Sequence, residues 1–575
     1  MTPDSGQSGG SARWVLTWTI AGLALRGLLI GFTNRITGDG VGWYIPMARA
    51  FFEGRWSDGF DVYVPPVYSI FVSAVARLLP AAVWQGPLGE AGALELAAQI
   101  TSALFGTASI PLVYLLVRRL APSSRAIDAA RVGVAMAAFS PFLSRLGAQV
   151  LTEATYTFFF LVAALAGLAL LRERRPGRAA LFGLAVGLAC LNRPEAMGLL
   201  IIIGAWIGLP ALLRPRALAG SAGLGLLVAA FFLVGLFPQM AVTHARSGVW
   251  TLSAKGGAIF KKSLLGDEVE KEKWLYPAPR AAGGAAEENS REEKKERAPE
   301  GSRMSIPGFI ARNPLLFTRH YVTELLGFAA NIPEVMGIGL LAFGLVGTLA
   351  RRKIPRGPDE GVGASIPIAY LLMLSLFHSS ERFLFPLLPF AILWSALGLQ
   401  EVVGRLREGG TARWIARLPG GLRRRPMVWV FRAAMALLFV EAVGTTAHAH
   451  HYAWYWSHEK GVGAWMRENL PPGTKVMTRS SMIEAYYAGA PVAYFPLAPY
   501  EEVISYLRRT EVRYVLMDDR KTVRLRPEFF RRFTAGDGAM VKTFDYGRKK
   551  VFLYEVKARR GAALSGGGRR EIFGS

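Results

Sequence analysis

The sequence predicts an α-helical polytopic membrane protein that ends in a small α/β soluble domain. Apolar residues make up 52% of its 575 residues and charged residues only 19%, a balance that does not fit a soluble multidomain enzyme. Basic residues fall in short clusters between long apolar runs, as in multi-pass membrane proteins. Near Glu459 the composition changes to that of a soluble domain of about 100 residues. We therefore expect a transmembrane domain over residues 1–450 and an extramembrane α/β domain over residues 459–557.

The membrane domain is predicted from about eleven apolar stretches, each long enough to cross roughly 30 Å of hydrocarbon. The first has Arg26 in its middle and no small-residue cleavage site after it, so we expect it to be retained rather than removed as a signal peptide. The stretches begin near Trp14, Leu94, Ala130, Val150, Ala179, Ala196, Ala217, Pro333, Gly363, Phe383 and Val428.

The orientation follows from the basic clusters, because positively charged loops stay on the cytoplasmic side. They occupy one alternating set of loops, at residues 118–131, 172–178, 214–216, 351–356 and 405–425. This alternation predicts a cytoplasmic N-terminus, provided that residues 66–79 do not cross the membrane. That segment has only about a dozen apolar residues after two prolines, so we expect a helix that lies at the outer surface.

The opposite side is where function is expected. It receives the first outer loop (residues 38–87), short links at 145–153, 192–195 and 378–382, the long loop 244–308, and everything after about residue 450. The middle of the long loop is dense in charge and poor in apolar residues, and the tail 558–575 is rich in glycine. We expect both segments to be disordered.

The C-terminal domain shows alternating helix and strand patterns. Helices are predicted over residues 461–470, 481–489 and 500–510, strands over 475–478, 491–495 and 512–519, and a final hairpin around Tyr546.

Asp39 follows the first membrane helix directly and lies between two glycines. Trp43, Tyr44 and Met47 then begin an amphipathic helix. Two interpretations are open at this point. Asp39 is either the N-cap of that helix or a functional carboxylate.

Other ionisable residues are expected on the same side. Glu153 begins a membrane helix, Arg193 and Glu195 occupy a turn, and His378, Glu381 and Arg382 lie in a link. Such groups at membrane depth are costly, so they line a site, pair with each other or reach toward the headgroups. The convergence of several segments that carry both signs of charge favours a site. Arg26 and Glu441 both lie inside membrane segments, and two interpretations are open for them, a structural ion pair or a catalytic role for one of them.

The order of these motifs resembles a known family. Asp39 with Trp43-Tyr44, Pro65-Pro66-x-Tyr68, Val-Leu-Thr-Glu ending at Glu153, Leu-Asn-Arg-Pro-Glu ending at Glu195, and Glu-Arg-Phe-Leu-Phe-Pro from Glu381 are similar to motifs of GT-C fold polytopic glycosyltransferases. The chain most resembles the bacterial branch related to protein O-mannosyltransferases, aminoarabinose transferases and lipopolysaccharide galacturonosyltransferases. It departs from many relatives at Gly40, where they have an acidic residue.

The resemblance implies transfer of a sugar, with inversion, from a polyprenyl-phosphate carrier to a glycan, lipid or protein acceptor outside the cytoplasm. It implies a bacterial inner-membrane location with the active site and the C-terminal domain on the outer side, contact with membrane lipids, and no nucleic acid partner. The implied catalytic residues are Asp39, as general base, and Glu153. The donor phosphate would bind Arg382 and Arg193, and other substrate contacts would come from Tyr44, Tyr68, Glu195, His378 and Glu381.

Three alternatives remain open. They are a secondary transporter, a non-catalytic binding or assembly protein, and an oligosaccharide ligase with a pyrophosphate-linked donor. Some members of the fold use a divalent ion held by paired carboxylates. Because no Asp-x-Asp motif surrounds Asp39 and Cys190 is the single cysteine, we expect no required metal or other cofactor.

Overall fold

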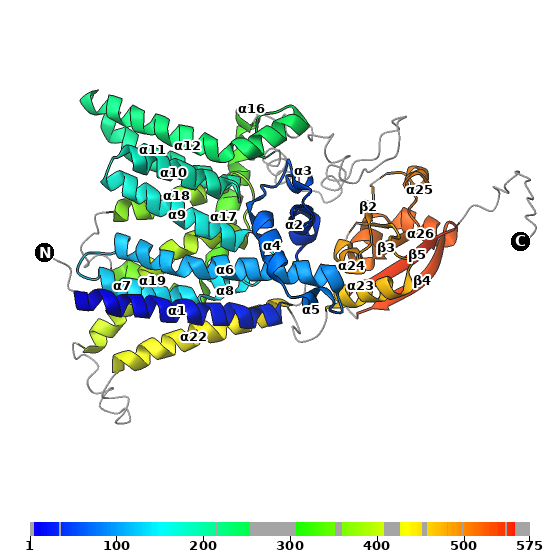
Figure 1. Cartoon of the computed structure of the whole chain (residues 1–575), viewed down its shortest axis with the longest axis horizontal. Coiled ribbons are helices and arrows are strands. Elements are labelled where there is room, and N and C mark those ends of the chain that lie inside the picture. The colour runs from blue at the N-terminus through cyan, green and yellow to red at the C-terminus, as the bar shows by residue number, and fades with distance from the viewer. Residues whose placement is uncertain are drawn as a thin grey trace, which may run out of the picture. The chain divides into compact units, whose positions relative to one another are not determined.

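The computed structural model describes residues 5–33, 36–212, 215–253, 306–350, 359–407, 426–450, 457–479, 481–496, 498–546 and 549–557. The chain divides into two compact units, residues 1–266 with 292–457 and residues 267–291 with 458–575. The first unit is helical and the second contains a sheet (Figure 1). The segments predicted to be disordered, the middle of the 244–308 loop and residues 558–575, lie outside the described residues.

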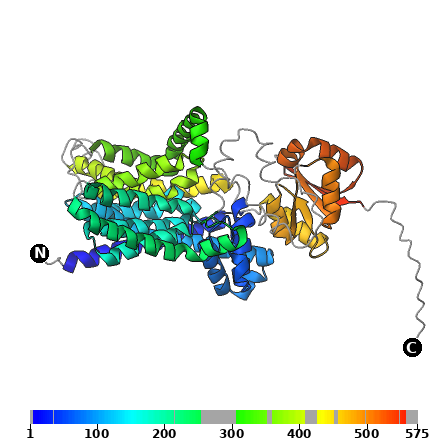
Figure 2. The same cartoon turned by 90° about the horizontal axis from the view of Figure 1, so that it is seen from above.

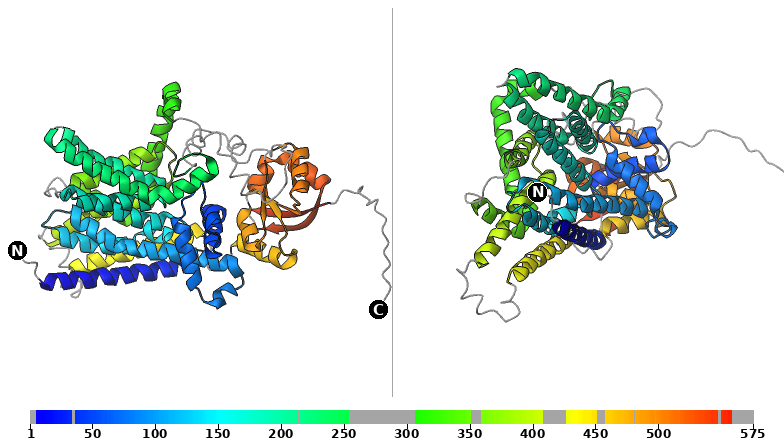
Figure 3. Two further views of the ribbon diagram at one scale, coloured as in Figure 1. Left: turned by 45° about the horizontal axis from the view of Figure 1, so that its top comes forward. Right: turned by 60° about the vertical axis from the view of Figure 1, so that its left-hand side comes forward.

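The first unit is a bundle of long helices that run alongside one another (Figures 2 and 3). Seven helices in the described part of the chain are long and apolar enough to cross a membrane. Each predicted apolar stretch coincides with a helix or begins within a few residues of one. The long helices are α1 (Ser5–Phe32), α6 (Gly89–Leu120), α7 (Ala126–Phe139), α9 (Glu153–Arg172), α10 (Pro176–Cys190), α11 (Gly198–Leu212), α12 (Pro215–Ser247), α17 (Pro314–Ala350), α18 (Glu360–Leu374), α19 (Leu388–Arg407) and α22 (Pro426–His450).

Helix contacts in the bundle rely on small residues, as expected where apolar surface alone gives no preference between helix and lipid. The clearest case joins α17 to α19. A methyl group on Gly347 would collide with the Trp394 carbonyl, and one on Gly398 would collide with the Phe343 carbonyl. The two backbones therefore approach closely only because both positions are glycine.

Helix α17 differs from its prediction, because it begins at Pro314 rather than near Pro333 and is interrupted at Gly337 (φ 71°, ψ 170°). The interruption frees backbone N–H groups in the second half of the helix. The Glu441 carboxylate of α22 accepts hydrogen bonds from the amides of Ile338 at 3.0 Å and Gly339 at 3.3 Å. Glu441 therefore caps a helix start inside the bundle.

The predicted pair between Arg26 and Glu441 is wrong. Arg26 donates instead to three backbone carbonyls, those of Gly22 at 3.0 Å and of Ala138 and Leu143 at 3.5 Å. The sequence placed both residues inside membrane segments, but it gave no information about the amides that the break at Gly337 exposes to Glu441.

Short helices connect α1 to α6: η1 (Gly40–Tyr44), α2 (Ile45–Phe52), α3 (Trp56–Gly59), α4 (Val67–Leu78) and α5 (Ala81–Trp84). Helix α4 has 12 residues, too few to cross roughly 30 Å of hydrocarbon at 1.5 Å per residue. Arg77, near the end of α4, donates hydrogen bonds to the carbonyls of Phe51 at 2.9 Å and Phe52 at 3.2 Å. These two residues are the last of α2.

The second unit is an α/β domain with a five-stranded sheet in the order β2-β1-β3-β5-β4. Strand β1 pairs in parallel with β2 and β3, and β5 pairs antiparallel with β3 and β4. The predicted strands, helices and final hairpin are present, and the helix α26 was not predicted. The elements are α23 (His458–Asn469), β1 (Val476–Thr478), α24 (Met482–Ala488), β2 (Val492–Tyr494), α25 (Tyr500–Arg509), β3 (Tyr514–Asp518), η6 (Asp519–Val523), α26 (Pro527–Ala535), β4 (Gly538–Asp545) and β5 (Lys550–Val556).

Candidate active site

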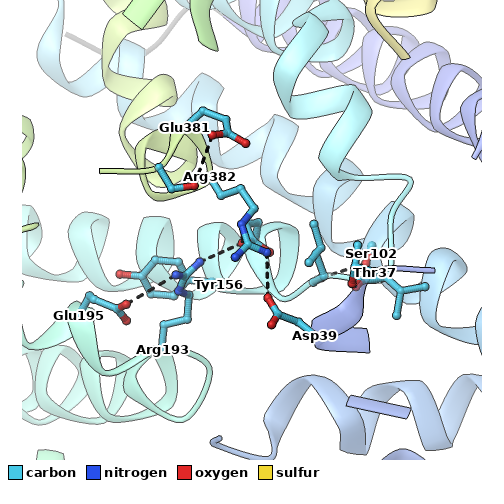
Figure 4. A network of polar contacts seen from close by, with 12 residues as sticks. Thr37, Asp39, Ser102, Tyr156, Arg193, Glu195, Glu381 and Arg382 are labelled. Atoms are coloured by element: carbon cyan, nitrogen blue, oxygen red, sulfur yellow. Dashed lines mark hydrogen bonds and ion pairs between the residues drawn. The ribbon is translucent and has the colours of Figure 1, made fainter. Parts of the chain in front are cut away.

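Four segments that are far apart in the sequence bring charged side chains together in the first unit (Figure 4). Asp39 lies between α1 and η1, and Glu153 is the first residue of α9. Arg193 precedes the short helix η2 (Pro194–Met197), which follows α10, and Arg382 lies in the short helix η5 (Glu381–Leu387), which leads into α19. We call this set, together with Glu195, the charged network.

The charged network is a chain of ion pairs. Arg382 Nη1 lies 3.0 Å from Asp39 Oδ2, and its Nε lies 3.8 Å from Glu153 Oε1. Arg193 Nη1 approaches the same Glu153 oxygen at 3.1 Å, and its Nη2 lies 3.6 Å from Glu195 Oε1. Three carboxylates and two guanidinium groups give the network a formal charge of −1.

Burial separates the network into a fixed part and an open part. The Glu153 side chain is 2% exposed, whereas Asp39 and Arg382 are 37% and 32% exposed. The second carboxylate oxygen of Glu153, Oε2, is buried and has no hydrogen-bond partner. The open pair is therefore accessible to a ligand, whereas the Glu153 carboxylate is buried.

Aromatic rings hold Arg193 in place. Its guanidinium lies 4.7 Å from the Phe383 ring centre and 5.7 Å from that of Tyr156. Burial opposes its charged form, but the carboxylates of Glu195 and Glu153 outweigh this effect and raise the pKa of Arg193 above its ordinary value. Arg193 thus remains a fixed cation. The hydroxyl groups of Tyr156 and Tyr370 also contact each other behind it.

The local structure around Asp39 contradicts the N-cap interpretation. Asp39 has helical backbone angles, and its side chain makes no capping hydrogen bond. Thr37 caps this turn instead. Its Oγ1 accepts a hydrogen bond from the Gly40 amide at 3.0 Å and donates one to the Val150 carbonyl at 3.0 Å. The Asp39 carboxylate is left to pair with Arg382.

Gly40 is closely surrounded by two side chains. A Cβ at this position would lie 2.8 Å from Cγ1 of Ile36 and 3.0 Å from Cγ1 of Val150. A side chain at this position would therefore require Ile36 or Val150 to move. The π-helical turn η1 starts at this same residue, and such turns are frequent at functional sites.

The two tyrosines predicted to contact substrate have different surroundings. Tyr44 is buried close to the network, and burial, followed by the charges of Asp39 and Glu153, raises its pKa, so its hydroxyl stays protonated. Tyr68 is fully buried, and its hydroxyl donates to the Ala98 carbonyl at 3.0 Å, with Ser102 Oγ also at 3.0 Å. The structure directs Tyr68 toward α6 rather than toward the network.

The remaining predicted residues lie beside the network. Glu381 accepts a hydrogen bond from Ser380 Oγ at 3.3 Å. His378 is 61% exposed, and its Nδ1 lies 3.8 Å from Glu324 Oε2. Glu324 of α17 was missed, although an ionisable residue within a membrane helix is itself a signal of function. Its carboxylate accepts a hydrogen bond from the Ser379 amide, three residues before Arg382.

The residues of the network do not resemble a metal site. Among the described residues, no group of three or more His, Cys, Asp or Glu side chains is arranged to hold a metal ion. Asp39 and Glu153 each have a guanidinium group as their ion-pair partner, a neighbour that disfavours a second cation. We therefore derive no step through a metal.

Comparison with known proteins identifies the fold. Residues 65–240 match the family described as dolichyl-phosphate-mannose-protein mannosyltransferase. ArnT from Cupriavidus metallidurans in the apo state is similar over 95% of this chain and 98% of its own, with 13% identity and a TM-score of 0.57. The same protein bound to undecaprenyl phosphate is similar over 94% of this chain and 98% of its own, with 14% identity and a TM-score of 0.56. The Archaeoglobus fulgidus oligosaccharyltransferase in complex with zinc and sulfate is similar over 88% of this chain and 68% of its own, with 16% identity and a TM-score of 0.55. No curated protein matches the chain in sequence.

These similarities show that the chain has the GT-C fold of polytopic membrane glycosyltransferases. The apolar helices and the fold agree on a multi-pass membrane protein. The family match and the fold together support a membrane glycosyltransferase.

Proposed function

We propose that the protein transfers a sugar, with inversion, from a polyprenyl-phosphate carrier to an acceptor hydroxyl outside the cytoplasm, with Asp39 as general base. The observation that carries this proposal is the open ion pair between Asp39 and Arg382 at 3.0 Å. It puts a carboxylate suited to deprotonate a hydroxyl beside a guanidinium suited to bind phosphate.

The chemistry uses both members of the pair. Asp39 removes the proton as the acceptor oxygen attacks the anomeric carbon, and the bond from that carbon to the phosphate oxygen breaks. The departing phosphate is already ionised, so it needs cations rather than a proton donor. Arg382 meets this need, and Arg193 adds a second positive charge behind Glu153, with which it pairs at 3.1 Å.

Donor binding would also release the base. A donor phosphate that binds Arg382 competes with Asp39 for the N–H groups of its guanidinium. Asp39 pairs with Arg382 at 3.0 Å, and in the donor complex its carboxylate would face the acceptor. Glu153 would stay between the two arginines and orient them.

Similar proteins support a lipid-linked donor. The family description names dolichyl-phosphate-mannose, and ArnT from C. metallidurans has been solved with undecaprenyl phosphate bound. The A. fulgidus oligosaccharyltransferase has been solved with a tethered acceptor peptide. For this chain we propose a polyprenyl-phosphate sugar as donor and a glycan, lipid or protein as acceptor.

The proposed location is the bacterial inner membrane. The positive-inside distribution supports a cytoplasmic N-terminus, with the charged network and the C-terminal unit on the outer side. A divalent metal is not part of the proposal, and we assign no role to the C-terminal unit.

A direct test compares a polyprenyl-phosphate sugar with its sugar-free lipid, using the full-length protein in nanodiscs. We expect both lipids to bind and the sugar-linked lipid to be converted to free polyprenyl phosphate when acceptor is present. Turnover of a pyrophosphate-linked donor alone would instead indicate an oligosaccharide ligase. Movement of an intact substrate across proteoliposomes without cleavage would indicate a transporter.

A further inference from the structure

Arginines from three helices gather at the end of α9 that lies opposite Glu153. Arg172 is the last residue of α9, Arg119 is next to last in α6, and Arg178 is in the first turn of α10. Because α9 has 20 residues and rises about 1.5 Å at each one, these arginines lie far from the charged network. The proposed reaction does not use them.

Two of these arginines share one carboxylate oxygen. Oδ2 of Asp359, the residue before α18, lies 2.7 Å from Arg119 Nε and 3.0 Å from Arg172 Nε. The Asp359 side chain is buried, and it makes no capping hydrogen bond to α18. One negative charge therefore balances only one of two positive charges.

The third arginine is held on the same turn of α9. Arg119 Nη2 donates a hydrogen bond to the Leu168 carbonyl at 2.8 Å, and Arg178 Nη1 donates one to the adjacent Ala169 carbonyl at 2.9 Å. These carbonyls belong to the C-terminal end of α9, where the helix dipole favours positive charge. The backbone of α9 thus fixes two guanidinium groups side by side.

A second carboxylate, that of Glu173, is also shared. Its Oε2 lies 2.9 Å from Arg178 Nη2 and 3.3 Å from Arg175 Nε, of the residue before α10. We call Arg119, Arg172, Arg175 and Arg178 the arginine cluster. Among the described residues, its four positive charges have two carboxylates as ion-pair partners, which leaves a formal charge of +2.

The excess charge of the arginine cluster is accessible. The side chains of Arg172, Arg175 and Arg178 are 44%, 76% and 33% exposed. A ligand can therefore reach these guanidinium groups from outside the bundle, and it needs no internal cavity.

The charge and the position of the arginine cluster indicate its ligand. Guanidinium groups bind phosphate through forked, charge-assisted hydrogen bonds. Helices α6 and α9 are long and apolar enough to cross a membrane, so their ends are expected at the level of the lipid headgroups. Basic pockets between membrane helices bind anionic headgroups at this level. We propose that the arginine cluster binds the phosphodiester headgroup of an anionic phospholipid.

Diffuse attraction is the alternative, because basic loops of membrane proteins stay on the cytoplasmic side whether or not they bind a lipid. Two observations favour a defined site. The guanidinium groups are held by backbone carbonyls and shared carboxylates, and they come from the ends of three helices rather than from one loop. The proposal does not rest on the proposed transferase activity, and its test needs no substrate.

The test measures the thermal unfolding of the full-length protein in detergent with added phosphatidylglycerol, which is anionic, or phosphatidylcholine, which is zwitterionic. We expect phosphatidylglycerol to give the larger, saturable rise in Tm, by a few degrees. Arg175→Gln should raise the half-saturating concentration roughly five-fold, the effect of one basic residue at a membrane surface. Arg49→Gln should not, because Arg49 pairs with Glu90 at the opposite end of α6.

A second variant should change lipid binding in the opposite direction. Asp359→Asn removes a carboxylate that competes with the lipid phosphate for Arg119 and Arg172. Phosphatidylglycerol should therefore half-saturate at a concentration roughly five-fold lower, although Tm without lipid falls. A fall in Tm without this change in lipid binding would overturn the proposal. Equal effects of the two lipids, or the same rise in Tm with inorganic phosphate at the same concentration, would also overturn it.

Arg175→Gln keeps the test valid if Asp359→Asn does not fold, because Arg175 is 76% exposed and its one printed ion pair is with Glu173. An unchanged half-saturating concentration in Arg175→Gln would assign the arginine cluster to diffuse attraction.

Discussion

The Arg382 guanidinium and the Asp39 carboxylate, 343 residues apart in the sequence, form an ion pair with an N–O distance of 3.0 Å. The pair joins the loop after α1 to η5. A donor phosphate and the proposed base therefore compete for one guanidinium group. This competition predicts an ordered reaction in which the donor binds before the acceptor is activated.

Arg382→Lys tests the shape of the phosphate contact. Lysine keeps the charge but cannot form two parallel hydrogen bonds to phosphate. We expect kcat/KM to fall by on the order of 30-fold to 1000-fold, equivalent to roughly 2–4 kcal/mol of transition-state stabilisation. Steady-state kinetics with a polyprenyl-phosphate sugar measure this. Near-normal kinetics would mean that Arg382 only anchors η5 at the membrane surface.

Gly327→Ala tests whether α17 positions Arg382. A Cβ on Gly327 would lie 2.9 Å from that of Ser379, so the added methyl group should displace the segment that leads to Arg382. Displacements of this kind at a phosphate contact cost roughly 10-fold to 100-fold in rate. Gly204→Ala on α11 is the matched control, because a methyl group there meets nothing within 4 Å. If both variants have the same activity, the contact does not position Arg382.

Glu324→Gln tests the same link through a hydrogen bond. The Glu324 carboxylate accepts from the Ser379 amide and lies 3.8 Å from both His320 and His378. Gln keeps one acceptor but loses the charge. We expect weaker binding of polyprenyl phosphate with little change in Tm. An unchanged affinity, with only the Tm lowered, would assign Glu324 to stability alone.

Cysteine labelling tests the orientation. In a Cys190→Ser background, single cysteines replace two exposed serines, Ser123 between α6 and α7 and Ser505 on α25. Because basic loops stay inside, a membrane-impermeant thiol reagent should label position 505 in intact cells and position 123 only after permeabilisation. The reverse pattern would put the charged network on the cytoplasmic side and would contradict the proposed reaction.

The pH dependence of the C-terminal unit should follow Glu484. Burial raises the pKa of this carboxyl group, against the opposing effect of Lys549 at 2.8 Å. The folded state therefore holds the proton more tightly, and stability falls as the pH rises from the ordinary value of about 4.5 through the raised pKa. Glu484→Gln should flatten this slope, and Glu502→Gln on the exposed face of α25 should not. The stability of the unit at each pH is measured by hydrogen exchange of β1 and β3 in the full-length protein. Parallel slopes of stability against pH in the unmodified protein and in both variants would contradict the prediction.

Much of the fold was predictable because a bilayer constrains sequence strongly. Every apolar stretch had to be helical, since no water is present to satisfy free backbone groups. The membership of the charged network followed from the same logic. Asp39, Glu153, Arg193 and Arg382 are costly at membrane depth and were predicted on one side of the membrane, so they were expected to meet.

The pairing of these charges was not predictable, because it depends on backbone detail. The break at Gly337 exposes amides that bind Glu441 and so separates it from Arg26. Thr37 caps the turn after α1 and leaves Asp39 to Arg382. Neither the break nor the cap has a signal in the hydrophobic pattern. The start of α17 was missed because Arg319 and His320 interrupt its apolar run.

The central claim, that Asp39 is the base and that Arg382 restrains it until the donor binds, is tested most directly by Asp39→Asn. Turnover and the affinity for polyprenyl phosphate are measured together in the full-length, lipid-reconstituted protein, with Asp58→Asn in the same loop as control. Asparagine cannot accept the proton and competes less for Arg382, so turnover should fall by at least ~100-fold while the lipid binds as tightly or more tightly. A stable Asp39→Asn protein with near-normal turnover would contradict the account and leave Glu153 as the next candidate base.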